Sequence, residues 1–308
     1  MARAVVFAYH DVGVRGLSVL LAHGIEVELV VTHRDDAGEN IWFASVEELA
    51  RIHGLTTAAP AGPSDVATRV ERLAPDFIFS FYYRHMLPAP MLAAAQRGAY
   101  NLHGSLLPKY RGRVPVNWAV LHGERETGVT LHEMVAQPDA GRIVDQMAVP
   151  ILPDDTALDV MRKVTVAAEV VLDRSLPRLL DGSVQPVAQD LARGSYFGGR
   201  KPEDGRIDWK HPAPRIHDLV RAVAPPYPGA FTDLAGRRLR ILRTRRLPDR
   251  APPGKASLGV DSWGRLVARC VDGGVLQILE CELDGEPLAA DNLRKSLGRE
   301  DVPLEGIT

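Results

Sequence analysis

Short apolar runs bounded by polar residues recur through the first 190 or so positions of the chain. Runs of this kind predict strands, here at residues 4–9, 26–31, 76–81 and 98–102. Periodic apolar residues flanked by capping residues predict helices at residues 12–23, 45–53, 116–122 and 156–181. Strands that alternate with helices indicate an α/β layer structure with a parallel sheet.

The remaining strand-like runs follow a different pattern. Residues 129–134 and 143–151 alternate in part, which predicts a β-ribbon or a sheet edge. After a glycine-containing stretch, a helix at residues 213–223 precedes short predicted strands at 231–234, 239–242, 265–270 and 275–281. Short strands separated by turns predict a small β-barrel or sandwich. We therefore predict a first domain at residues 1–189, a linker at 190–204 and a second domain at 205–308.

Composition narrows the class of protein. A chain of 308 residues, 45% of them hydrophobic, is long enough for two domains with packed cores. A net charge of −2 argues against a nucleic-acid partner. No apolar stretch approaches the ~20 residues of a membrane span, and no apolar signal region opens the chain. We predict a cytoplasmic protein without membrane insertion, and the pattern predicts no oligomeric state.

The arginines of the second domain concentrate in one predicted strand. Residues 237–246 contain six of them, in part alternating with apolar residues. An anion-binding face and a strand with one solvated face both fit this pattern, and the solvated face is favoured.

The candidate chemistry lies at the end of the strand predicted at residues 98–102. Asn101 and His103 are two positions apart, so on an extended strand both side chains point to one face. Gly104 then allows the backbone to turn, and Pro108 ends regular structure. In an open parallel sheet, ligands bind at the carboxyl ends of strands. We therefore expect an amide and an imidazole side by side at a binding edge.

Other site types lack their motifs. The first strand–helix turn contains only Gly13 and Gly16, not the three spaced glycines of a dinucleotide site, and no phosphate-binding G-x-x-x-x-G-K-[ST] motif occurs. His132 and Glu133 are not part of an H-E-x-x-H motif. We therefore predict neither NAD nor ATP as a cofactor and no metal.

Residues 101–112 read Asn-x-His-x-Ser-Leu-Leu-Pro-x-Tyr-Arg-Gly, and residues 139–141 read Asp-Ala-Gly. These motifs resemble the folate-dependent formyltransferases. The resemblance implies a Rossmann-like parallel-sheet catalytic domain followed by a small OB-like β-barrel domain. Further blocks at residues 5–11, 79–85 and 221–224 look like the branch of the family that formylates UDP-4-amino-4-deoxy-L-arabinose, a step of lipid A modification linked to polymyxin resistance.

The resemblance implies that Asn101, His103 and Asp139 are catalytic and that 10-formyltetrahydrofolate is the co-substrate. The chemistry of these residue types agrees with those roles. An amide N–H stabilises a developing oxyanion, and an imidazole handles protons near neutral pH. A carboxylate beside the imidazole is expected to raise the pKa of His103.

The resemblance also implies a folate site. Its residues would be His85, Met86, Leu87, Arg113, Val135, Ala136, Gln137, Pro138 and Asp139. Apolar walls with a few fixed polar groups suit a flat heterocycle such as a pterin.

Three functions remain open at this point. The first is an N-formyltransferase that acts on a UDP-amino sugar. The second is a methionyl-tRNA formyltransferase, against which the slightly acidic chain argues. The third is a non-catalytic folate-binding or scaffold protein of the same fold.

Overall fold

The computed structural model describes residues 1–36, 38–234, 236–298 and 301–305. The chain forms two compact units, each with its own sheet. The first unit comprises residues 1–115, 126–150 and 161–198, and the second comprises residues 116–125, 151–160 and 199–308. The chain therefore enters the second unit three times.

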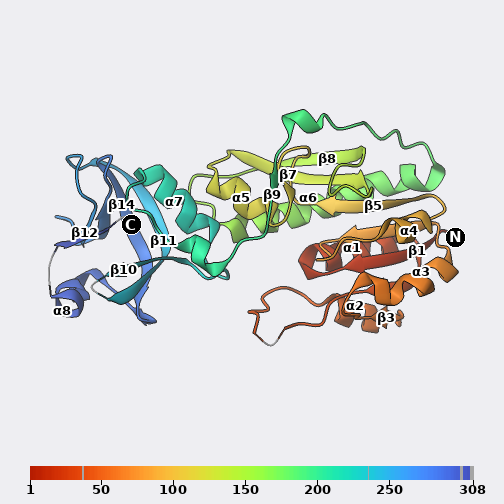
Figure 1. The fold of residues 1–308 in the computed structure, drawn as a ribbon, viewed down its shortest axis with the longest axis horizontal. Coiled ribbons are helices and arrows are strands. Elements are labelled where there is room, and N and C mark those ends of the chain that lie inside the picture. The colour runs from red at the N-terminus through yellow and green to blue at the C-terminus, as the bar shows by residue number, and fades with distance from the viewer. Residues whose placement is uncertain (37, 235, 299–300, 306–308) are drawn as a thin grey trace. The chain divides into compact units, whose positions relative to one another are not determined.

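A seven-stranded sheet with the order β3-β2-β1-β4-β5-β7-β8 organises the first unit (Figure 1). Five neighbouring strands run parallel, which confirms the predicted parallel sheet. The last two strands run antiparallel to their neighbours. The strands of the sheet are β1 (Arg3–Ala8), β2 (Glu26–Val31), β3 (Thr57–Ala58), β4 (Phe77–Phe81), β5 (Gly98–His103), β7 (Glu126–Glu133) and β8 (Ile143–Pro150).

The central strands are apolar on both faces because helical connections cover parallel sheets. All five residues of β4 are buried, and so are five of the six residues of β1. The helices and 3₁₀ turns in the first 198 residues are α1 (His10–Ala22), α2 (Val46–Ile52), η1 (Pro63–Val66), α3 (Ala67–Leu73), α4 (Ala89–Ala93), α5 (Pro115–Leu121), α6 (Ala157–Asp181) and η2 (Leu191–Arg193). A two-stranded parallel ribbon pairs β6 (Arg111–Gly112) with β9 (Tyr196–Phe197).

Two predicted helix starts are confirmed by their caps. The Ser45 hydroxyl accepts a hydrogen bond from the Glu48 N–H at 3.2 Å, and the Thr156 hydroxyl accepts one from the Asp159 N–H at 3.2 Å. Each cap satisfies one of the amide groups that a helix leaves unpaired at its start.

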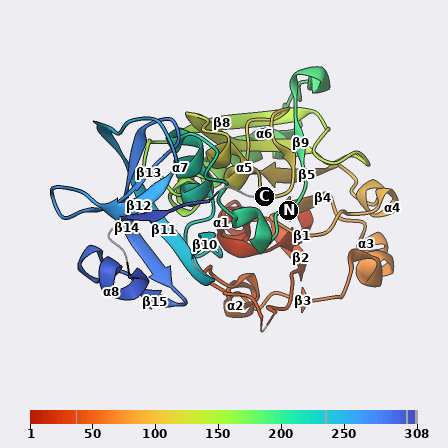
Figure 2. The ribbon, with the colours of Figure 1, turned by 60° about the vertical axis from the view of Figure 1, so that its left-hand side comes forward.

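A curled antiparallel sheet forms the second unit, with the order β10-β11-β14-β13-β12-β16 (Figure 2). Its elements are η3 (Pro202–Gly205), α7 (Ala213–Ala222), β10 (Ala230–Leu234), β11 (Arg237–Arg250), β12 (Ser257–Val260), β13 (Leu266–Arg269), β14 (Gly274–Leu283), β15 (Glu286–Pro287), η4 (Ala290–Asn292), α8 (Leu293–Leu297) and β16 (Asp301–Pro303). Register shifts interrupt the pairing of β11 with β14, and such bulges bend a strand. Ile216 and Val220 of α7 share a buried cluster with Leu239, Ile241 and Leu276 of the sheet.

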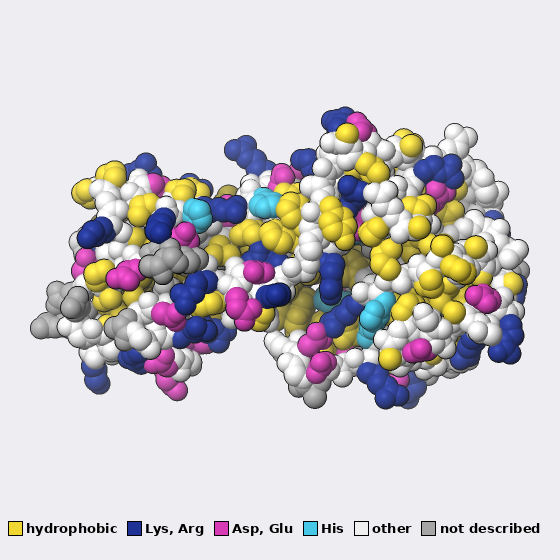
Figure 3. All heavy atoms as spheres, in the orientation of Figure 1, with side chains coloured by type: hydrophobic (Ala, Val, Ile, Leu, Met, Phe, Trp, Pro, Cys, Tyr) yellow, Lys and Arg dark blue, Asp and Glu magenta, His cyan; other side chains and the backbone are white. Residues whose placement is uncertain are grey.

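The arginine-rich strand has a solvated face, as predicted. Arg240 pairs with Glu282 at 3.1 Å across the β11–β14 ladder, and Arg237 pairs with Asp284 at 2.6 Å. Basic and acidic side chains are also intermixed over the face of the molecule in Figure 3. In the part of the chain that the structure describes, no helix is both long enough and apolar enough to cross a bilayer.

Candidate active site

Asn101 and His103 lie at the carboxyl end of β5, on the strand face that they share with Ala99. In the parallel pairing with β4, Ser80 lies opposite Asn101. In the antiparallel pairing with β7, His132 lies opposite Asn101. The predicted strand position of both side chains is therefore confirmed, and β5 extends one residue beyond its predicted end.

The loop after β5 folds back onto His103. The Thr130 hydroxyl on β7 donates to the Ser105 carbonyl at 2.7 Å and accepts from the Leu107 N–H at 3.1 Å. These two bonds anchor the loop to the neighbouring strand. The loop then places the Tyr110 carbonyl oxygen 2.7 Å from Nε2 of His103.

This contact defines the tautomer of His103. A carbonyl oxygen only accepts, so Nε2 carries the hydrogen and donates it to Tyr110, which leaves Nδ1 as the proton acceptor. Nδ1 lies 3.5 Å from Oδ1 of Asp139. The structure therefore brings together His103 and Asp139, which are far apart in the sequence, and places the basic nitrogen on the side of the carboxylate.

The Asp139 carboxylate acts to raise the pKa of His103, as expected, but burial has the larger effect and the net shift is downward. Burial lowers the pKa of His103 below the ordinary imidazole value, because a protonated ring loses its hydration there. The Asp139 carboxylate and the Tyr110 carbonyl act in the opposite direction without reversing the shift. The side chain of His103 is only 7% exposed. The imidazole is therefore neutral at neutral pH and able to accept a proton.

Asp139 stays ionised in this environment. Its Oδ2 accepts a hydrogen bond from the Gly112 N–H at 2.8 Å, and its Oδ1 lies 3.6 Å from Nε2 of His132. Burial alone would raise the pKa of Asp139, but attraction to the protonated forms of His103 and His132 and the hydrogen bond from the Gly112 N–H together lower it well below the usual carboxyl range. A fixed negative charge therefore faces both imidazoles.

His132 is a residue that sequence reasoning missed, because it was considered only as a metal ligand. Its Nδ1 lies 2.7 Å from the Glu133 carbonyl and therefore carries the hydrogen. Its Nε2 then accepts from Nδ2 of Asn101 at 3.1 Å. This bond orients the amide and uses one of its two N–H groups, so the second remains for a ligand. The cross-strand register that pairs the two residues is not readable from sequence.

The Asp-Ala-Gly motif has a backbone explanation. Asp139 has a φ of 51°, a left-handed conformation that aspartate adopts more readily than most residues. A Cβ on Gly141 would lie 1.9 Å from the Glu133 carbonyl oxygen, so only glycine fits there. The Gln189 side chain donates to the carbonyls of Asp139 and Gly141 at 3.0 and 2.6 Å. The backbone of the motif thus determines how the Asp139 carboxylate is placed next to β5.

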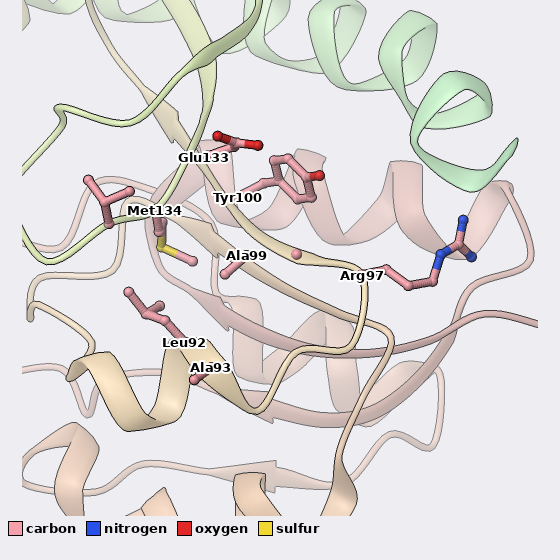
Figure 4. A pocket seen from close by; sticks show the side chains of 9 residues that line it. Leu92, Ala93, Arg97, Ala99, Tyr100, Glu133 and Met134 are labelled. Atoms are coloured by element: carbon pink, nitrogen blue, oxygen red, sulfur yellow. The ribbon is translucent and has the colours of Figure 1, made fainter. Parts of the chain in front are cut away.

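A pocket of about 350 Å³ opens at the start of β5. Its apolar wall contains Leu92, Ala99 and Met134, whose side chains lie on one side of the strand, whereas Tyr100 and Glu133 point to the other side (Figure 4). Ala99 shares its strand face with Asn101 and His103. The pocket therefore lies at one end of a row that leads to the catalytic candidates.

The predicted folate residues are distributed unevenly around this pocket. Val135 lines it, and Leu87 is buried in the same core cluster as Ala99. Met86 is 55% exposed, and the His85 ring centroid lies 5.1 Å from that of His33. The other predicted folate residues lie outside the lining of the pocket: Ala136, Gln137, Pro138, Asp139 and the exposed Arg113. Their role in folate binding stays a prediction.

Within the described residues, no three His, Cys, Asp or Glu side chains are arranged so that they could hold a metal ion.

The amide of Asn101, the neutral imidazole of His103 and the carboxylate of Asp139 can act together on a carbonyl carbon. The amide offers a hydrogen bond to the oxygen, the imidazole takes up a proton, and the carboxylate stabilises the resulting imidazolium.

Two family profiles match this chain. One, described as "Formyl transferase", matches residues 13–176. The other, described as "Formyl transferase, C-terminal domain", matches residues 200–297.

Solved structures share the fold. An N-formyltransferase from Helicobacter canadensis, in complex with folinic acid and dTDP-3-aminofucose, has a TM-score of 0.73 and 20% identity, over 90% of this chain and 99% of that one. WlaRD, a sugar 3N-formyltransferase solved with dTDP and 5-N-formyl-THF, has a TM-score of 0.72 and 19% identity, over 91% and 98%. Glycinamide ribonucleotide transformylase 1 from Symbiobacterium toebii has a TM-score of 0.53 and 25% identity, over 61% and 94%.

Proposed function

Because this chain belongs to the formyl transferase family, we propose that it transfers a formyl group from 10-formyltetrahydrofolate to the 4-amino group of a UDP-amino sugar. The proposed acceptor is UDP-4-amino-4-deoxy-L-arabinose, whose formylation belongs to lipid A modification and polymyxin resistance. The observation that carries the proposal is the convergence of Asn101, His103 and Asp139 at the end of β5.

Each of these residues has one task in the proposed reaction. The acceptor amine attacks the formyl carbon, a new C–N bond forms, and negative charge develops on the formyl oxygen. The free N–H of Asn101 donates to that oxygen, which is typically worth ~10²–10³ in rate. His103 takes the proton that the amine loses, at Nδ1, 3.5 Å from Asp139. When the bond to the folate nitrogen breaks, His103 returns the proton to the leaving nitrogen.

We propose that the reduced pterin binds in the pocket beside Ala99. Leu92, Ala99 and Met134 form an apolar wall at the correct end of the row for a ring whose formyl group reaches Asn101. One structure of this fold was solved with folinic acid and dTDP-3-aminofucose, and another with 5-N-formyl-THF and dTDP. These ligands support a formyl folate and a nucleotide sugar as the two substrates.

A substrate panel tests the proposal. The purified protein is incubated with 10-formyltetrahydrofolate and, separately, with UDP- and dTDP-linked amino sugars and charged initiator tRNA. We expect mass spectrometry to detect a formyl group on UDP-4-amino-4-deoxy-L-arabinose. Formylation of tRNA alone would replace the proposal with the methionyl-tRNA activity. Absence of transfer to every acceptor, with folate still bound, would support a non-catalytic folate-binding protein.

His132 is expected to act as a positioning residue. In His132→Gln, the amide of Asn101 loses its fixed acceptor, so we expect kcat to fall roughly tenfold, as the loss of one hydrogen bond allows. The KM values for both substrates should change little, because the proposed role of His132 is to orient Asn101 and not to bind either substrate. Steady-state kinetics with each substrate varied separately checks this split.

The matched control is His217→Gln in the second unit. His217 is as buried as His132, at 2% exposure, and also bonds through both ring nitrogens, to Thr244 and to Pro153. If the two variants lose equal amounts of kcat for equal losses in thermal stability, His132 has only a structural role.

A further inference from the structure

Arg111 has a buried guanidinium N–H without an acceptor in the part of the chain that the structure describes. Its side chain is half-buried, and its Nε is shielded from solvent without a hydrogen-bond partner. No ion pair involves Arg111 among the residues that the structure describes. A shielded N–H of a charged group without a partner is costly unless a ligand supplies the missing acceptor.

The position of Arg111 links it to the reacting groups. The residue before it, Tyr110, accepts the hydrogen bond of His103, and the residue after it, Gly112, donates to Asp139. The Arg111 N–H is itself bonded to the Ser195 carbonyl at 2.9 Å, in the ribbon of β6 with β9. The backbone on either side of Arg111 is thus hydrogen-bonded to the two members of the catalytic pair, His103 and Asp139.

The row of side chains on β5 has two ends, from which the two substrates can approach Asn101 and His103. The apolar pocket lies at Ala99, followed by Asn101 and then His103, whose Nε2 contacts the carbonyl next to Arg111. If the formyl donor occupies the pocket at Ala99, the acceptor reaches the formyl carbon from the other end of the row. Arg111 lies at that end.

We propose that Arg111 binds the diphosphate of the nucleotide-sugar acceptor and so delivers its amine to Asn101 and His103. This inference rests on the proposed function. A guanidinium presents several N–H groups in one plane, which matches the oxygens of a phosphate. The charge of the acceptor would also compensate the cation only when the acceptor is bound.

Arg113 provides an internal contrast. It lies two residues further along, bears the same charge and is exposed, and its expected partner is the folate. If Arg111 recognises the acceptor, the two arginines should affect the KM values of different substrates. Arg51, whose side chain pairs with Glu48 on the same exposed helix face, serves as a control for the loss of one positive charge.

The test compares Arg111→Gln, Arg111→Lys, Arg113→Gln and Arg51→Gln in the full chain. Calorimetry measures the Kd of UDP and of dTDP at low and high NaCl, and kinetics gives the KM of each substrate. For Arg111→Gln we expect the nucleoside-diphosphate Kd and the acceptor KM to rise ~10- to 100-fold, with a smaller salt dependence and an unchanged formyl-folate KM. Arg111→Lys should recover part of the affinity, since the charge remains without the fork.

Other outcomes overturn the inference. If Arg111→Gln binds the nucleoside diphosphates as the unmutated protein does, the residue does not recognise the diphosphate. If only the formyl-folate KM rises, its partner is the folate carboxylate. If the unmutated protein binds neither nucleotide and formylates no nucleotide sugar, the proposed function fails, and the role of Arg111 fails with it. Melting temperatures exclude unfolding, and Arg111→Lys carries the test if Arg111→Gln does not fold.

Discussion

Replacement of His103 by glutamine is expected to lower kcat/KM for formyl transfer by about 10²- to 10⁴-fold. Glutamine retains an N–H that can reach the Tyr110 carbonyl, which accepts from His103 at 2.7 Å. It offers no group that takes up a proton near neutral pH. The decrease in kcat/KM therefore measures the loss of proton transfer at Nδ1 of His103 more than any disturbance of the loop that follows β5. Initial rates with both substrates saturating, and then limiting, measure it.

His23→Gln is the matched control. His23 also pairs with a carboxylate, Asp173, at 2.8 Å, but on the surface of the first unit. Its replacement should leave the rate unchanged. A His103→Gln enzyme that works at the rate of His23→Gln would remove His103 from the mechanism.

The pH profile of the unmutated enzyme belongs to the same prediction. Burial lowers the pKa of His103, so its neutral, proton-accepting form persists below the ordinary imidazole value of 6.5. We expect kcat/KM to be level from pH 8 down to about 6.5 and to fall only in more acid solution. A decline that begins above pH 7 would mean that Asp139 dominates over burial.

Replacement of Asp139 by asparagine is expected to have the second large effect, a decrease in kcat/KM of about 10²- to 10⁴-fold. The amide keeps the size of the side chain and an acceptor for the Gly112 N–H. It removes the negative charge that would stabilise a proton on His103, 3.5 Å away. The pKa of His103 should fall further, so the acid limb of the remaining activity should move to lower pH. Single-turnover rates across pH measure both effects.

Stability gives an independent check on Asp139. Its folded pKa lies below the value of the unfolded chain, so the ionised carboxylate contributes stability above pH ~4 that is lost as pH falls through the folded pKa. The difference in unfolding free energy between the unmutated protein and Asp139→Asn should therefore shrink in acid. Asp173→Asn, at the exposed pair with His23, should show little difference at any pH. A constant difference for Asp139→Asn would contradict an ionised carboxylate at this position.

Local pattern was sufficient for the elements and for part of the site. The apolar runs of β1 and β4 and the caps at Ser45 and Thr156 depend on neighbouring residues only, and the structure confirms them. The shared face of Asn101 and His103 follows from the two-residue period of a strand. The charge pattern of β11 likewise predicted a solvated face, because alternation along one strand determines which side chains meet water.

The electrostatics of the site depend on contacts between distant segments. The pKa of His103 depends on how completely β7 and the loop after β5 exclude water, and no spacing along the chain encodes that balance. The role of His132 requires the β5–β7 register, and the unpartnered Nε of Arg111 is visible only once its surroundings are known.

The sequence by itself determined the α/β order, the β-rich second unit, and the strand that carries an amide beside an imidazole. Only the tertiary structure decided that Asp139 faces His103, that burial outweighs this carboxylate, and that His132 orients Asn101. The physical reason is the difference in the distance along the chain over which the two kinds of interaction act. Strand and helix periodicity act over a few residues, whereas solvation and charge at a buried site depend on every segment folded around it.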